Sequence, residues 1–362
     1  MDYEEIVKEQ MENAADPESL NSIAEEAYRI TDGLSGSISI DSILESVLQG
    51  ESIFQSPEII SSLKSLFFYE LKSATALCAE IISICIIMGL IKSLSDSFKS
   101  KSVSKLTLLL CTMVIAGISI NSFRISSQIA QDSVEIMTKT MEILMPILIG
   151  ILLGTGSIAS GTVLSPLILA SVTGFAYLMK TIVIPALFLS TVLTLLDCLT
   201  EKYYVKKLGR LLRSGALFLT GLVMTILSGI ITIQGLLTET SDGLLINTAK
   251  YSISSFIPIV GGFTSDTVEL FLQCMGSIRS VVGVFGILML VFIMAVPLIK
   301  ITAIGAVYKL TAALAEPVAD DKITDGLNEM GNGMISMSAI VLFTSLLFIL
   351  FITIIIRIGG AG

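Results

Sequence analysis

The sequence predicts an all-α polytopic membrane protein. Of its 362 residues, 53% are hydrophobic and only 15% are charged, and the mean hydropathy is +0.87. A typical soluble domain has about 25% charged residues, so this composition excludes a disordered chain and argues strongly against a soluble globular enzyme. Apolar stretches of about 20 residues recur along the chain, and that is the length an α-helix needs to cross a bilayer.

Seven stretches are long and apolar enough to be candidate spans. They are 73–91, 106–123, 162–179, 181–196, 214–237, 281–299 and 335–356. An eighth, 143–155, is short and rich in glycine. Amphipathic or Gly/Pro/Ser-rich pieces lie between them at 124–142, 245–275 and 300–315. The prediction is therefore eight spans, or six with re-entrant pieces.

The first 72 residues form a separate acidic segment, which precedes the transmembrane domain expected over 73–362. They contain 15 acidic and four basic residues, a net charge of −11 within the −9 of the whole chain. Helix-start patterns occur at Asp16-Pro17-Glu18 and Ser56-Pro57-Glu58, where proline occupies the first helical position. We expect short amphipathic helices on the membrane surface or against the rest of the protein, with a solvated acidic tail as the alternative.

The distribution of lysine and arginine predicts the orientation, because such residues concentrate in short cytoplasmic loops. Twelve of them lie in the loops 92–105, 197–213 and 300–334, whereas 124–142 and 238–280 have two each. The three basic loops are therefore expected in the cytoplasm. The acidic N-terminus and the end at Arg357 are then extracytoplasmic.

An internal repeat is suggested by a shift of 112 residues, which superimposes Pro146 on Pro258 and Pro185 on Pro297. The same shift brings Gly150 onto Gly262. Repeat A is expected over about 106–213 and repeat B over about 214–334, both running in the same direction, followed by the final span 335–356.

The prolines and glycines of this repeat are candidate conduit or hinge residues. Proline removes a backbone donor from a helix, and broken helices in a membrane must pack in protein or line water. Matching breaks in two halves point to a transport path. Simple kinks in a helical bundle explain the prolines equally well.

Two charged residues interrupt the predicted spans, Glu80 in 73–91 and Lys180 between 162–179 and 181–196. A charge in mid-membrane is costly and often functional, so Glu80 is a candidate ion or proton ligand, with a structural ion pair as the alternative. Lys180 is expected to snorkel to the surface from a helical hairpin.

A basic stretch in the second cytoplasmic loop is a candidate docking site for a cytoplasmic partner. It contains Lys206, Lys207, Arg210 and Arg213 beside tyrosines and leucines. A topology anchor in anionic lipid is the simpler alternative. The spacing Gly150-x-x-x-Gly154 permits close helix packing and leaves association with further copies of the chain open.

Several kinds of chemistry find no support in the residues. Histidine is absent, which excludes His-based zinc sites and Ser-His-Asp triads. No Gly-Lys-Ser/Thr sequence is present, so a Walker-type phosphate loop is excluded. The five cysteines contain no C-x-x-C pair and resemble small buried hydrophobes. We expect no catalytic residue, metal or cofactor, and the acidic balance gives no support to nucleic-acid binding.

Three motifs carry a resemblance to a known family. They are Met145-Pro146-Ile147-Leu148 with its Gly/Ser-rich tail, the segment from Ser255 to Phe263 around Pro258, and Leu314–Gly326 around Glu316-Pro317. Their order and spacing over roughly 55–357 resemble the stage III sporulation protein AE family of endospore-forming bacteria.

The resemblance implies a polytopic protein of the mother-cell membrane around the forespore. It also implies membership of a channel complex that contains a secretion-ATPase-like protein and ring-forming proteins. In such a complex the protein would be an export-gate-like or permease-like platform without enzymatic residues. A stand-alone ion-coupled secondary transporter, using Glu80 and the broken helices, is the alternative.

Overall fold

The computed structural model describes residues 57–97, 101–155, 157–197, 205–256 and 261–358. Every regular element in these ranges is helical, in agreement with the predicted fold class. The elements are α4 (Pro57–Ser97), α5 (Lys101–Gly154), α6 (Ile158–Leu178), the π-helical turn η2 (Met179–Val183), α7 (Ile184–Asp197), α8 (Lys206–Phe256), α9 (Gly261–Ala315) and α10 (Asp321–Arg357). The helices expected before residue 57 lie outside the described residues.

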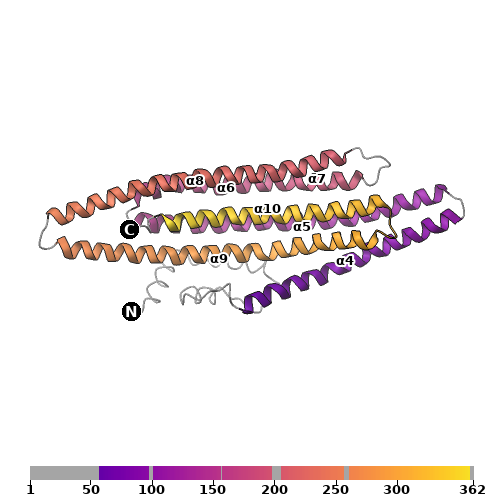
Figure 1. Ribbon diagram of the computed structural model, residues 1–362, viewed down its shortest axis with the longest axis horizontal. Helices are drawn as coiled ribbons and strands as arrows, with labels where there is room; N and C mark the ends of the chain where they lie inside the picture. Colours follow the sequence, from indigo (N-terminus) through magenta and orange to yellow (C-terminus); the bar gives the residue numbers. More distant parts are fainter. Residues whose placement is uncertain (1–56, 98–100, 156, 198–204, 257–260, 359–362) are drawn as a thin grey trace.

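The long helices lie side by side in an elongated bundle (Figure 1). α10 lies inside it, in contact with α5, α7, α8 and α9, and its most extensive contact is with α9. The chain passes from α4 to α5, from α7 to α8 and from α9 to α10 at the same end of the bundle, on the right in Figure 1. We call this the basic end, because the three predicted basic loops contain these connections.

Six segments of the described chain are long and apolar enough to cross a membrane, so the protein is a multi-pass membrane protein. They are Phe67–Ile91, Leu109–Gly154, Ser165–Asp197, Lys206–Gly235, Cys274–Ala315 and Asp321–Arg357. The lower of the two predicted counts is the one observed. Helix α4 begins at Pro57, as its start pattern predicts, and continues through 73–91 without interruption.

The prediction of two spans at 162–179 and 181–196 is wrong. Helix α6, the turn η2 and α7 form one continuous run that passes through Lys180 without reversing. Pro185 explains the π-helical turn, because a proline clashes with the carbonyl one turn earlier and an extra residue in that turn relieves the clash. The hairpin expected to let Lys180 snorkel does not form.

The segments 124–142 and 300–315, expected between spans, and the short stretch 143–155 are not separate elements. Segment 124–142 and nearly all of 143–155 lie within α5, which contains Pro146, and 300–315 lies within α9, which contains Pro297. A proline removes only one intrahelical hydrogen bond, and the flanking apolar residues hold the helix in the bundle. Near Pro146, Met145 and Leu148 are fully buried. The chain leaves the helix only after Gly154, at the Gly/Ser-rich tail.

The interior consists of apolar side chains spaced at helical intervals. Met137, Met141 and Met145 recur every four residues along α5, and Met330, Met334 and Met337 lie at intervals of four and three along α10; all are buried. Residues at this spacing lie on one face of a helix. Flexible methionine side chains fill the irregular gaps between packed helices, so these two seams form much of the contact surface inside the bundle.

Hydroxyl groups enter this apolar interior by bonding to their own helix. Ser133 donates to the carbonyl of Ile129, Thr311 to that of Val307 and Thr344 to that of Ile340. Such bonds to the carbonyl four residues earlier satisfy the hydroxyl without a partner on another helix. Many polar residues in the spans therefore need no functional explanation.

Candidate functional site

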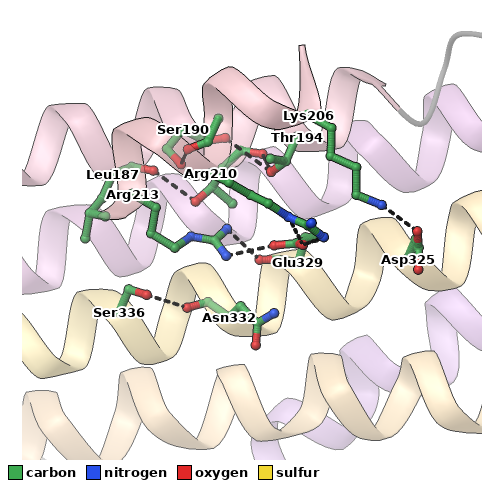
Figure 2. Close-up of polar contacts among 12 residues, drawn as sticks. Leu187, Ser190, Thr194, Lys206, Arg210, Arg213, Asp325, Glu329, Asn332 and Ser336 are labelled. Atoms are coloured by element: carbon green, nitrogen blue, oxygen red, sulfur yellow. Dashed lines mark hydrogen bonds and ion pairs between the residues drawn. The ribbon is translucent and has the colours of Figure 1, made fainter. Parts of the chain in front are cut away.

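An ionic cluster joins the first turns of α8 to α10 near the basic end (Figure 2). Arg213 Nη1 lies 2.7 Å from Glu329 Oε2, and Arg210 Nη2 lies 2.9 Å from Glu329 Oε1. Arg213 also donates to the backbone carbonyl of Glu329. Lys206 Nζ lies 2.6 Å from Asp325 Oδ2. Three of the four predicted docking residues are therefore bound within the chain, and only Lys207 of that set stays outside the cluster.

The spacing of these residues explains how the cluster forms. Lys206, Arg210 and Arg213 follow one another at intervals of four and three residues, which places them on one face of α8. Asp325 and Glu329 are four residues apart on α10. Lys206 to Asp325 and Arg210 to Glu329 have the same separation of 119 residues, as expected for two helices that run parallel.

The contact between Glu329 and Arg213 is the buried part of the cluster. The side chain of Glu329 is 9% exposed and that of Arg213 is 12% exposed, whereas that of Arg210 is 60% exposed. A buried carboxylate must be paired and hydrogen-bonded, and removal of its partner is strongly destabilising. Arg213 therefore holds Glu329 in place, while the exposed Arg210 contributes less.

Asp197 caps the N-terminus of α8, close to the ionic cluster. Its carboxylate accepts hydrogen bonds from the backbone N–H groups of Val205 at 3.0 Å and Lys206 at 3.2 Å. The residue is almost completely buried. Carboxylates stabilise helix N-termini by satisfying free N–H groups and by interacting with the helix dipole. Asp197 thus fixes the start of α8 and is more than the end of a membrane span.

Two glycines allow the helices around the cluster to approach closely. A Cβ atom on Gly209 would lie 2.6 Å from Thr194 Cγ2, and the Ser190 hydroxyl donates to the Gly209 carbonyl at 2.5 Å. A Cβ atom on Gly333 would lie 2.5 Å from Thr191 Oγ1 and 2.9 Å from Phe123 Cε2. These contacts lock α5, α7, α8 and α10 together beside the ion pairs.

Lys180 takes part in a second ionic contact, nearer the middle of the bundle. It forms a hydrogen-bonded ion pair with Glu135 of α5. Lys139 lies 3.6 Å from the same carboxylate. All three side chains are between 42% and 46% exposed. The pair therefore links the π-helical turn to α5 at the surface of the bundle.

The candidate conduit residues do not converge on one interior path. Pro146, Gly150 and Pro185 are exposed on the outside of a single chain, whereas Pro297 is buried. Gly262 lies in the first turn of α9, and Pro258 is outside the described residues. The helices α5 and α9 continue through their prolines without a break. The internal repeat and the conduit remain predictions.

Glu80 lies on the exposed side of α4. It is close enough to Tyr308 of α9 for an electrostatic interaction. Lys309, the next residue, packs beside Gly331 of α10. Gly331 is two residues from Glu329, so Glu80 is near the ionic cluster along the bundle axis. The Glu80 carboxylate is therefore near the middle of the apolar stretch 73–91, but it lies toward the basic end of the bundle and not at its centre.

The cluster binds helices to one another and has no evident catalytic arrangement. No group of three or more His, Cys, Asp or Glu side chains that could hold a metal occurs in the part of the chain that the structure describes. Glu329, Asp325 and Glu135 were not recognised from sequence. Their partners lie 45 to 119 residues away, and pairs that distant are identified only by the tertiary arrangement.

Comparisons with known proteins give a consistent result. The sequence model of the family described as stage III sporulation protein AE matches residues 38–359. A relative from Bacillus subtilis (strain 168), described as "Stage III sporulation protein AE", is 29% identical over 313 residues, which cover 86% of this chain and 78% of the relative. No solved structure matches the chain.

Proposed function

Because the chain belongs to the stage III sporulation protein AE family, we propose that it is a non-enzymatic membrane subunit of a sporulation-specific channel complex. In this role it is an export-gate-like or permease-like platform between mother cell and forespore. The observation that carries the proposal is the family match over residues 38–359. Within the chain, the ionic cluster joins α8 to α10 through a buried Arg213–Glu329 pair at one end of the bundle.

The proposal includes an orientation and a membrane. The basic end, with the loops 92–105, 197–213 and 300–334, would face the mother-cell cytoplasm, as the lysine and arginine distribution favours. The N-terminus would lie in the space between the mother-cell and forespore membranes. Ring-forming subunits would contact the protein from that space, and a secretion-ATPase-like subunit from the cytoplasm.

A narrower docking surface follows from the cluster. Lys207, Leu208 and Leu211 are exposed at the start of α8, with Leu208 at 49% and Leu211 at 68%. We call these three residues the docking surface. The ionic cluster holds their helix in a fixed position, so a cytoplasmic subunit would meet a preformed site and lose little conformational entropy on binding.

The position of Glu80 favours this role over that of a stand-alone transporter. An ion-coupled transporter needs its ionisable residue in the substrate path, usually inside the bundle or in a water-filled cavity. Glu80 is instead exposed on the outside of α4. The structure therefore adds no support to a path through Glu80 within one copy.

Affinity purification of the tagged full-length protein from sporulating cells, in mild detergent, tests the proposal. Mass spectrometry is expected to identify the secretion-ATPase-like and ring-forming proteins. The variant Lys207→Glu with Leu211→Ser should lose the cytoplasmic subunit and keep the ring-forming ones. Lys64→Glu, an equal charge change at an exposed site on α4, is the control and should keep both. Recovery of the wild-type protein without these subunits would contradict the proposal.

A further inference from the structure

Two exposed charges on different helices have no ion-pair partner among the residues that the structure describes. Glu80 lies in the span Phe67–Ile91 of α4, and Lys309 lies in the span Cys274–Ala315 of α9. The ionic contacts near them use other residues, such as Lys300 with Glu70. Both lie near the basic end, where Lys309 is level with Gly331 of α10. Opposite charges that have no partner within one copy can pair between two copies.

The two residues lie at the same level along the bundle. Helices α4 and α9 run in the same direction, and two contacts fix their register: Lys300 Nζ lies 3.6 Å from Glu70 Oε1, and Gly89 packs against Val318. Glu80 is ten residues after Glu70, and Lys309 is nine after Lys300. The electrostatic interaction between Glu80 and Tyr308 agrees with this register.

Helical geometry keeps the two charges apart within one copy. Lys300 contacts Glu70 and so marks the side of α9 that faces α4. Lys309 is nine residues after Lys300, which is about two and a half turns and corresponds to the opposite face of α9. Its side-chain stem lies against Gly331 of α10. Glu80 and Lys309 thus lie at the same height along the bundle axis but on different sides of the molecule.

Each charge lies beside exposed apolar residues. On α4, Ile87 is 53% and Leu90 is 60% exposed, and both lie on the Glu80 side of the helix. On α9, Leu310, the residue after Lys309, is 54% exposed. We call Glu80, Ile87 and Leu90 the α4 surface, and Lys309 and Leu310 the α9 surface.

Lipid alone does not account for the α4 surface. Gly89 packs against Val318, so Leu90 is level with the α9–α10 turn at the end of the bundle. Lys309 is level with Gly331, which precedes the apolar stretch 335–356 of α10. If 335–356 lies in the bilayer, the part of the α4 surface near Leu90 extends past it and needs a protein cover.

We propose that copies of this chain associate head to tail, with the α4 surface of one copy against the α9 surface of the next and Glu80 paired with Lys309. A rotation axis parallel to the bundle preserves the level of every residue, so equal levels are what such an arrangement requires. Each copy offers one surface of each kind. An interface between two different surfaces is heterologous and forms a ring when its rotation closes.

The test uses two differently tagged full-length copies expressed together and extracted in mild detergent. Capture through one tag is expected to recover the other. Glu80→Lys in both copies, or Lys309→Glu in both, should reduce that recovery by at least about tenfold, because like charges then face each other at the interface. Glu80→Gln keeps the shape of the side chain but removes its charge, so it should also reduce recovery, by less than the charge reversals do.

Expressing one copy with each charge reversal tests whether Glu80 and Lys309 pair between copies or within one chain. When one copy carries Glu80→Lys and the other Lys309→Glu, every contact between unlike copies again joins opposite charges, and recovery should return. A pair within one chain cannot be repaired in this way. Lys64→Glu, at an exposed site near the start of α4, is the control for charge reversal and should leave recovery unchanged.

Three results would overturn the proposal. The first is that wild-type copies do not recover each other, in which case lipid or another protein covers the two surfaces. The second is that both single reversals recover as much partner as the wild type. The third is that the mixture of reversals stays as weak as either reversal alone.

Discussion

Arg213 and Glu329 are 116 residues apart in the chain, and their side chains meet at 2.7 Å with little exposure to solvent. The pair joins α8 to the helix that contacts α5, α7, α8 and α9. Arg210, Lys206 and Asp325 surround it with more exposed charges. The arrangement indicates that the stability of the basic end depends mainly on one carboxylate.

Replacement of that carboxylate should therefore be costly. Glu329→Gln leaves Arg213 buried without its counter-charge, and we expect a loss of about 2–3 kcal/mol in the free energy of unfolding. Thermal unfolding in mild detergent measures the effect. Asp325→Asn is the matched control, because Asp325 is 49% exposed, and it should cost less than about 1 kcal/mol. Equal losses for the two variants would contradict the assigned role of Glu329.

The two arginines that bind Glu329 should differ in importance. Arg213→Met removes the buried partner, and we expect a loss of about 2 kcal/mol, whereas Arg210→Met removes a mostly exposed one and should cost about 0.5 kcal/mol. A double-mutant cycle with Glu329→Gln should give a larger coupling energy for Arg213 than for Arg210. The opposite order would show that burial does not determine the strength of these pairs.

A glycine in the first turns of α8 should not tolerate a methyl group. Gly209→Ala places a Cβ atom 2.6 Å from Thr194 Cγ2, and overpacking of this kind typically costs about 1–3 kcal/mol. Gly221→Ala is the control in the same helix, where nothing lies within 4 Å of the added atom. Because alanine favours a helix over glycine by about 1 kcal/mol, that variant should be neutral or more stable. Destabilisation by both would indicate that close packing is not the cause.

The described part of the fold was largely predictable from local pattern. Apolar stretches identified the spans, and the Ser56-Pro57-Glu58 pattern identified the start of α4. The errors arose where local signals compete with packing. Pro146 predicts a helix break, but α5 continues through it because packed neighbours stabilise the helix. At Pro185 the π-helical turn absorbs the clash, and two predicted spans become one.

Only the basic half of the ionic cluster was predictable from the sequence. The basic residues of α8 were recognised as a group, because lysine and arginine stand out after an apolar stretch. Their partners Asp325 and Glu329 were not, because ion pairs over 119 residues depend on the parallel arrangement of α8 and α10. Nothing in the sequence context of Asp197 shows that the chain returns to it at Val205, so its role at the start of α8 could not be predicted.

Photo-cross-linking in sporulating cells tests the central claim most directly. The substitutions Lys207→p-benzoylphenylalanine and Leu211→p-benzoylphenylalanine place the probe on the docking surface, and Leu346→p-benzoylphenylalanine places it at an exposed site on α10 as the control. A platform that binds a cytoplasmic subunit should give adducts with the secretion-ATPase-like protein at 207 and 211 and none at 346. Absence of protein adducts at 207 and 211, or identical adducts at all three sites, would contradict the account.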